Sequence, residues 1–270
     1  MRLVGLAFIL CLPLISHAQC DDQKNEVWAA EACTKVRTYH SPRQSTHPRL
    51  MVVLHGDAPF HPPDYHYQLA EILASNSDNL IAVGMLRPGY SDPDGRTSDG
   101  AKGDAIGDNY DAPRVRQIAE AIEQLRDKYQ PSNVILVGHS GGAAITGNLI
   151  ATYPDLVDEA VLVSCPCNIN QWRTDMFQLT GKSFFKGDLD VISPVDQVND
   201  VSTNTHITLI TGKEDPVARP TLSHEYFEAL QKADKSAELI TVDGGHEIFL
   251  SPPVIRQLLH ITNEKQSELR

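Results

Sequence analysis

The chain has 270 residues and a formal net charge of −12. This length suits one large domain with a full hydrophobic core. The acidic balance argues against nucleic-acid binding and against attraction to anionic membranes, because both partners carry negative charge. Beyond residue 18, no apolar run is long enough to span a bilayer. We therefore expect no nucleic-acid partner and no stable membrane insertion, and the oligomeric state stays open.

Residues 1–18 have the pattern of a secretory signal peptide. Arg2 gives a positive start, an apolar run follows, and small residues precede a cleavage point after Ala18. Cleavage there would deliver the mature protein to an extracellular or periplasmic compartment, where disulfides persist. Gln19 stands immediately before Cys20, where a lipobox needs a small residue, so we expect no lipid anchor.

Four cysteines remain after this cleavage: Cys20, Cys33, Cys165 and Cys167. Four cysteines allow three pairings, and the sequence alone does not choose between them. Proximity along the chain favours Cys20–Cys33 and Cys165–Cys167. The Cys-Pro-Cys segment has no third or fourth ligand at metal-binding spacing. We expect the cysteines to be structural, and we expect neither a metal nor an organic cofactor.

The mature chain begins with a polar N-terminal arm over residues 19–35 and then alternates between strands and helices. A short edge strand is predicted at residues 36–39. Further strands are predicted at residues 50–54, 80–86, 134–137, 160–163, 207–210 and 239–242. Helices are predicted at residues 65–74, 143–153, 222–230 and 254–261, and along the apolar stripe from Val115 to Tyr129. This alternation predicts an α/β fold with a mostly parallel sheet and helices on both faces.

One long segment interrupts the alternation between the strands predicted at 160–163 and 207–210. A segment of this length without a strand is unusual inside a compact domain and is often functional. It contains several aromatic residues, among them Trp172 and Phe184. We expect residues 165–205, approximately, to form a short cap insertion within a single domain that extends from residue 36 to residue 270.

The strand predicted at 134–137 leads directly into Gly138-His139-Ser140-Gly141-Gly142. A buried strand, a Gly-x-Ser-x-Gly turn and a helix in this order form a nucleophile elbow. The glycines two residues before and after Ser140 let the chain turn sharply enough to hold the serine hydroxyl at the tip of the turn. The pattern therefore predicts that Ser140 is a catalytic nucleophile.

A serine nucleophile needs a base, and the base needs an acid that orients it. In folds with this elbow the acid and then the histidine follow the serine along the chain. Asp215 comes after a predicted strand, with Glu214 as a neighbouring competitor, and we predict Asp215 as the acid. His246 is flanked by glycine after the last predicted strand, and we predict it as the base. His224 is expected at the surface of a helix.

The tetrahedral intermediate of acyl transfer needs backbone N–H donors for its oxyanion. We predict the N–H of Gly141, directly after the nucleophile, as one donor. The second is predicted from the loop after the strand at 50–54, with Asp57 preferred over Ala58. The Asp57 carboxylate must then point away from the oxyanion, because two negative charges would oppose each other.

These residues together resemble the α/β-hydrolase superfamily. The resemblance is carried by the elbow, by Gly212-Lys213-Glu214-Asp215, by Gly245-His246 and by His55-Gly56, all in the order of that family. It covers nearly the whole mature chain and implies the α/β-hydrolase fold. Softer similarities are to prolyl-oligopeptidase-type catalytic domains, at residues 193–195 and 226–230, and to proline iminopeptidases, at residues 87–92.

The resemblance implies a serine hydrolase with Ser140, His246 and Asp215 as a catalytic triad. We expect a secreted or periplasmic enzyme that cleaves a carboxylic ester through an acyl-enzyme intermediate. The alternative is a serine peptidase or amidase that uses the same triad, so the substrate is a small-molecule ester or a short peptide. A third hypothesis is a non-catalytic binding protein on a hydrolase scaffold, which the presence of all three triad residues disfavours.

Overall fold

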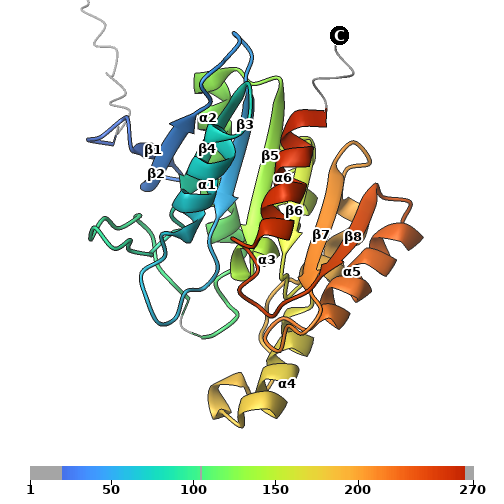
Figure 1. Cartoon of the computed structure of the whole chain (residues 1–270). Helices are drawn as coiled ribbons and strands as arrows, with labels where there is room; N and C mark the ends of the chain where they lie inside the picture. Colours follow the sequence, from blue (N-terminus) through green and yellow to red (C-terminus); the bar gives the residue numbers. More distant parts are fainter. Residues whose placement is uncertain (1–19, 104, 265–270) are drawn as a thin grey trace, which may run out of the picture.

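The computed structural model describes residues 20–103 and 105–264, so the predicted signal peptide lies outside the described residues. The described residues form one eight-stranded sheet in the order β1-β2-β4-β3-β5-β6-β7-β8 (Figure 1). The strands are β1 (Glu26–Ala29), β2 (Ala32–His40), β3 (Arg49–Leu54), β4 (Leu80–Met85), β5 (Asn133–His139), β6 (Glu159–Val163), β7 (His206–Gly212) and β8 (Ala237–Val242). β1 and β2 run antiparallel to their neighbours, and all other pairs are parallel. The predicted mostly parallel sheet is therefore confirmed.

Helices cover both faces of this sheet (Figure 1). One face carries α1 (Tyr65–Ser75) and α6 (Pro252–Glu264), and the other carries α2 (Ala112–Tyr129), α3 (Gly141–Thr152) and α5 (Pro220–Lys232). Strands β3, β4 and β6 are buried along their whole length, as expected for parallel strands covered on both faces. The carboxyl ends of the parallel strands, and the loops that follow them, lie along one edge of the sheet.

The strand predicted at residues 36–39 is part of the longer strand β2. Residues 36–40 of β2 pair with β4, and residues 32–35 pair with β1. The sequence analysis does not predict β1. The turn between β1 and β2 has positive φ angles of 49° at Ala30 and 61° at Glu31, as a two-residue hairpin turn requires. Glycine or asparagine usually signals such a turn, and neither occupies it here.

The segment between β6 and β7 contains α4 (Ile169–Thr180) and two short 3₁₀ helices, Ser183–Phe185 and Pro194–Asp200. In Figure 1, α4 lies away from the sheet, at the bottom of the view. Arg173 of α4 is buried, and its guanidinium donates to the backbone carbonyls of Gly187, Ile106 and Phe184. One side chain thus joins α4 to the chain that follows it and to the loop before α2.

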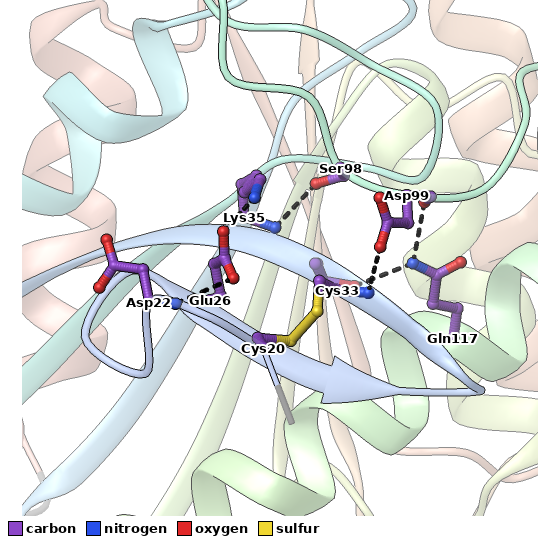
Figure 2. The surroundings of a disulfide bond; sticks show 9 residues. Cys20, Asp22, Glu26, Cys33, Lys35, Ser98, Asp99 and Gln117 are labelled. Atoms are coloured by element: carbon purple, nitrogen blue, oxygen red, sulfur yellow. Dashed lines mark hydrogen bonds and ion pairs between the residues drawn. A yellow bond between two sulfur atoms is a disulfide. The ribbon is translucent and has the colours of Figure 1, made fainter. Parts of the chain in front are cut away.

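Two disulfides are formed, Cys20–Cys33 and Cys165–Cys167, which is the pairing that proximity favoured. Figure 2 shows how the first one lies beside the loop that follows β4. The backbone N–H of Cys33 donates to Asp99 Oδ2 at 2.8 Å, and the N–H of Asp99 donates to the Cys33 carbonyl at 3.0 Å. The N-terminal hairpin therefore holds the loop after β4 in place through the hydrogen bonds between Cys33 and Asp99.

No helix in the described parts of the chain combines the length and the apolar composition that crossing a bilayer requires.

Three histidines are buried at the carboxyl edge of the sheet: His55, His66 and His139. Burial lowers the pKa of His66 and of His139 to about 3 and lowers that of His55 well below its ordinary value. Within the described residues, neither ring nitrogen of His66 has a hydrogen-bond partner, and its ring packs on His55 and Tyr67. His66 and His139 are therefore neutral in the folded protein above about pH 3.

We predict that these histidines make the fold sensitive to acid. Between about pH 6.5 and pH 3 the unfolded chain binds protons that the folded protein excludes, so the free energy of unfolding falls as the pH falls. His66 and His139 each contribute about 1.4 kcal/mol per pH unit across this window. The replacement His66→Phe keeps an aromatic ring and removes one titrating group. Urea unfolding at pH 5 and pH 8 should show a smaller pH dependence for this variant than for the wild type; an equal dependence would contradict the assignment.

Candidate active site

Ser140 lies in the sharp turn between β5 and α3. Its φ of 52° and ψ of −119° are strained for a residue with a side chain and cost on the order of 1–3 kcal/mol. The turn brings backbone segments very close together. A Cβ on Gly138 would lie 2.3 Å from the Gly142 carbonyl oxygen, and a Cβ on Gly142 would lie 2.5 Å from the His55 carbonyl oxygen. The elbow therefore requires glycine at both positions.

His246 lies between Ser140 and Asp215. Its Nε2 is 3.0 Å from Ser140 Oγ, and its Nδ1 is 2.9 Å from Asp215 Oδ2. A carboxylate only accepts hydrogen bonds, so Nδ1 carries the proton that faces Asp215. The lone pair of Nε2 then faces the serine hydroxyl, as a general base requires. The structure thus brings together the three residues that the sequence analysis predicted.

Asp215 is fixed by its own backbone surroundings. Its Oδ1 accepts the N–H groups of Val217 at 2.8 Å and Ala218 at 2.9 Å, and its side chain is fully buried. Glu214, the neighbouring competitor, is exposed and accepts the Gly244 N–H at 2.9 Å. Asp215, and not Glu214, therefore occupies the position beside His246. His224 is exposed on α5, as expected.

The two predicted oxyanion donors come from the loops after β3 and β5. Within the described part of the chain, the backbone N–H groups of Gly141 and Asp57 have no acceptor in the protein. The loop after β3 lies against the elbow, since a Cβ on Gly56 would be 3.0 Å from Ser140 Cβ. Two free N–H groups beside a nucleophile can bind a developing oxyanion.

The Asp57 side chain is held by two residues that the sequence analysis did not predict for the site. Its Oδ1 accepts from Arg87 Nη1 at 3.0 Å, and its Oδ2 accepts from the Tyr110 hydroxyl at 2.5 Å. Burial and the adjacent carboxylate raise the pKa of Tyr110 well above its ordinary value, so this hydroxyl keeps its proton. Arg87 is fully buried and also donates to the His55 carbonyl at 3.2 Å. The buried Arg87 thus balances the carboxylate and supports the loop.

No sequence pattern predicts the contacts of Arg87 and Tyr110 with Asp57. Arg87 stands in the turn after β4, in the segment that resembles proline iminopeptidases, and Tyr110 ends a polar loop.

Cys20, Glu26 and Cys33 are close enough to share a metal ion, but a disulfide joins both sulfur atoms, so no thiolate is available there.

The chain belongs to the alpha/beta hydrolase family. The family model named "Alpha/beta hydrolase family" matches residues 51–200, which include the elbow and the loop after β3. No curated protein matches the chain in a sequence search. Membership of the family agrees with the resemblance that the motifs carried and defines the protein as a hydrolase by class.

Solved structures of hydrolases share the fold at low sequence identity. The esterase Pf2001 from Pyrococcus furiosus superposes with a TM-score of 0.64 at 15% identity, over 88% of each chain. Est1E from Butyrivibrio proteoclasticus gives 0.66 at 13% identity, over 90% of this chain and 98% of that one. Proline iminopeptidase from Mycobacterium smegmatis gives 0.64 at 14% identity, over 89% and 99%. At such identities the likeness concerns the fold alone.

We predict that Gly138→Ala destabilises the protein by about 3 kcal/mol or more, because the new methyl group meets backbone that cannot move without opening the elbow. The matched control is Gly181→Ala at the end of α4. Gly181 has a φ of 67° but nothing within 4 Å of an added Cβ, so this change costs only about 1 kcal/mol of backbone strain. Urea unfolding measures both. Equal losses in the two variants would contradict the steric argument.

Proposed function

We propose that the protein is a serine hydrolase that cleaves a carboxylic ester through an acyl-enzyme intermediate, with Ser140, His246 and Asp215 as its catalytic triad. The single observation that carries the proposal is the continuous hydrogen-bonded arrangement from Asp215 through His246 to Ser140, with separations of 2.9 and 3.0 Å. Membership of the alpha/beta hydrolase family supports it, since the elbow, acid and base stand in the order of that fold.

In the acylation step, Ser140 Oγ attacks the ester carbonyl carbon while His246 Nε2 takes the hydroxyl proton. Asp215 stabilises the imidazolium and keeps the proton on Nδ1. The carbonyl oxygen becomes an oxyanion, which accepts hydrogen bonds from the backbone N–H groups of Gly141 and Asp57. When the tetrahedral intermediate collapses, the alcohol leaves with the proton from His246, and the acyl group stays on Ser140.

Deacylation repeats the sequence with water. His246 takes a proton from the water molecule as its oxygen attacks the acyl carbon, and it returns that proton to Ser140 Oγ as the acid leaves. The proposed chemistry needs neither a metal nor an organic cofactor.

Ester substrates lead the proposal because Pf2001 is an esterase and one structure of Est1E holds ferulic acid. Peptidase activity is the second candidate, and its support is the fold shared with a proline iminopeptidase. The same triad serves both reactions, so the bond cleaved depends on the pocket and on the leaving group. We also propose that residues 165–205 form a cap over the site. The support is that Arg173 of α4 donates a hydrogen bond to the Ile106 carbonyl, in the loop that ends at Tyr110.

We predict that Ser140→Ala and His246→Ala each lower turnover by at least about 10³-fold without unfolding the protein, and that Asp215→Asn loses about 10²–10⁴-fold. The control is Glu214→Gln, which removes a neighbouring charge but keeps an acceptor for Gly244; it should stay within about threefold of the wild type.

The assay compares a short acyl nitrophenyl ester with aminoacyl and prolyl-peptide anilides. Turnover of the ester alone supports an esterase, and comparable turnover of an anilide makes the peptidase the leading candidate. A fluorophosphonate, whose phosphorus bonds to Ser140 Oγ as fluoride leaves, tests the serine independently of substrate choice. Absence of labelling at Ser140 would reject both enzymes and favour a binding protein.

The proposal extends to location: the protein is secreted or periplasmic, with its signal peptide removed after Ala18. Two disulfides support this, since such bonds persist in oxidising compartments. We predict that N-terminal sequencing of protein recovered from the producing cell's periplasm or medium starts at Gln19. A mature chain that still starts at Met1, or that accumulates in the cytoplasm, would contradict this part of the proposal.

A further inference from the structure

Two side chains outside the proposed triad, the half-buried Tyr65 and the buried His139, connect the loop of the base to the loop of the second oxyanion donor. Tyr65 is the first residue of α1, and His139 stands beside the nucleophile at the end of β5. The Tyr65 hydroxyl lies 2.5 Å from the Gly56 backbone nitrogen and 3.0 Å from His139 Nδ1. His139 Nε2 lies 3.1 Å from the backbone carbonyl oxygen of His246.

The chemistry of these groups fixes the direction of every hydrogen bond between them. A carbonyl oxygen only accepts, so His139 Nε2 carries a proton and donates it to the His246 carbonyl. Burial keeps this imidazole neutral, so its Nδ1 has a lone pair and accepts from the Tyr65 hydroxyl. Burial raises the pKa of Tyr65, which keeps that hydroxyl protonated. The Tyr65 oxygen is then free to accept the Gly56 N–H.

We propose that Tyr65 and His139 are positioning residues. Their hydrogen bonds hold the second oxyanion donor and the catalytic base in a fixed position relative to each other. The inference rests on the proposed function. Gly56 directly precedes Asp57, so fixing the Gly56 N–H orients the backbone from which the Asp57 N–H projects. His139 fixes the backbone of His246, whose ring faces Ser140.

We call the hydrogen bonds from Gly56 through Tyr65 and His139 to the His246 carbonyl the relay. Aromatic packing around Tyr65 and His139 holds the relay in place. The Tyr65 and His139 rings meet edge to face, with 5.5 Å between their ring centroids. The ring of Phe249 packs on both, with its centroid 5.7 Å from that of Tyr65 and 4.9 Å from that of His139. Phe249 is 2% exposed. Rings fixed in this way have little freedom to seek other partners, so the hydrogen bonds transmit a defined geometry. An error of about 1 Å in the position of a catalytic group can cost roughly 100-fold in rate.

The competing explanation is that Tyr65 only fills space in the core. Phenylalanine would satisfy that role equally well, because all of the ring contacts remain in Tyr65→Phe. The positioning role requires the hydroxyl alone. The chain offers a control in Tyr226 of α5, which is fully buried where Tyr65 is half-buried, and whose hydroxyl has no hydrogen-bond partner among the described residues.

The test measures kcat and KM of Tyr65→Phe and Tyr226→Phe on a nitrophenyl ester, with kcat expressed per serine titrated by a fluorophosphonate. We expect Tyr65→Phe to lose about 10- to 100-fold in kcat, with KM within about threefold, and to react more slowly with the fluorophosphonate. Tyr226→Phe should keep both rates. Misfolded protein is not titrated, so it does not lower kcat expressed per titrated serine. A purely structural role of Tyr65 would reduce the amount of folded protein and leave this kcat unchanged.

A second pair of variants addresses His139. Glutamine has an amide N–H that can donate to the His246 carbonyl and an oxygen that can accept from Tyr65, whereas leucine has neither. We expect His139→Gln to retain at least tenfold more activity per titrated serine than His139→Leu. In the double variant Tyr65→Phe/His139→Leu the losses should be markedly less than additive, because both changes break the same relay.

The outcomes separate the two proposals. If Ser140→Ala is inactive but Tyr65→Phe has the kcat of the wild type per titrated serine, the relay is rejected and the serine hydrolase stands. Equal activity of the two His139 variants would also reject the relay. If the fluorophosphonate does not label Ser140 in the wild type, the proposed function fails, and the positioning role fails with it.

Discussion

The site depends on the absence of side chains at two positions of the elbow. Gly138 and Gly142 let the end of β5, the start of α3 and the end of β3 approach to distances that no Cβ would permit. This close approach holds Ser140 in its strained conformation and brings the loop at Gly56 against the serine. The strain is tolerated because the buried strands and α3 around it supply far more stabilisation than the turn costs.

A second constraint concerns charge. The loop that offers a proposed oxyanion donor also carries a carboxylate, Asp57, whose negative charge would oppose the oxyanion. The carboxylate accepts from Arg87 and Tyr110 but still lies against the elbow, since a Cβ on Gly141 would be 2.3 Å from Asp57 Oδ1, so the Arg87 guanidinium must offset its negative charge. Arg87 is fully buried and the Asp57 side chain is 22% exposed, so the buried guanidinium depends on this carboxylate for its charge partner. The polar interior of this edge is therefore a set of mutually dependent groups rather than a collection of separate contacts.

The parallel strands, their helices and the residues Ser140, Asp215 and His246 could be predicted because each carries a local signal. In each case a strand is followed by a glycine-containing turn, and the predicted side chain lies in or directly after that turn. The contacts that support the site have no such signal. Tyr65 reaches His139 across 74 positions, and Tyr110 reaches the loop after β3 across 53, so only the folded chain reveals these pairs. Hairpin β1–β2 escaped prediction for a local reason, since its turn lacks the usual residues.

The three carbonyl contacts of Arg173 have a consequence for how α4 can move. Two of the carbonyls, those of Gly187 and Phe184, belong to the segment that follows α4, and the third, that of Ile106, belongs to the loop before α2. A movement of α4 alone would break three charge-assisted hydrogen bonds, each worth about 1.5–3 kcal/mol, whereas a movement of α4 together with residues 183–187 would break only the one to Ile106. The side chain of Arg173 therefore favours motion of α4 and residues 183–187 as one unit, with the hydrogen bond to Ile106 holding that unit to the loop before α2.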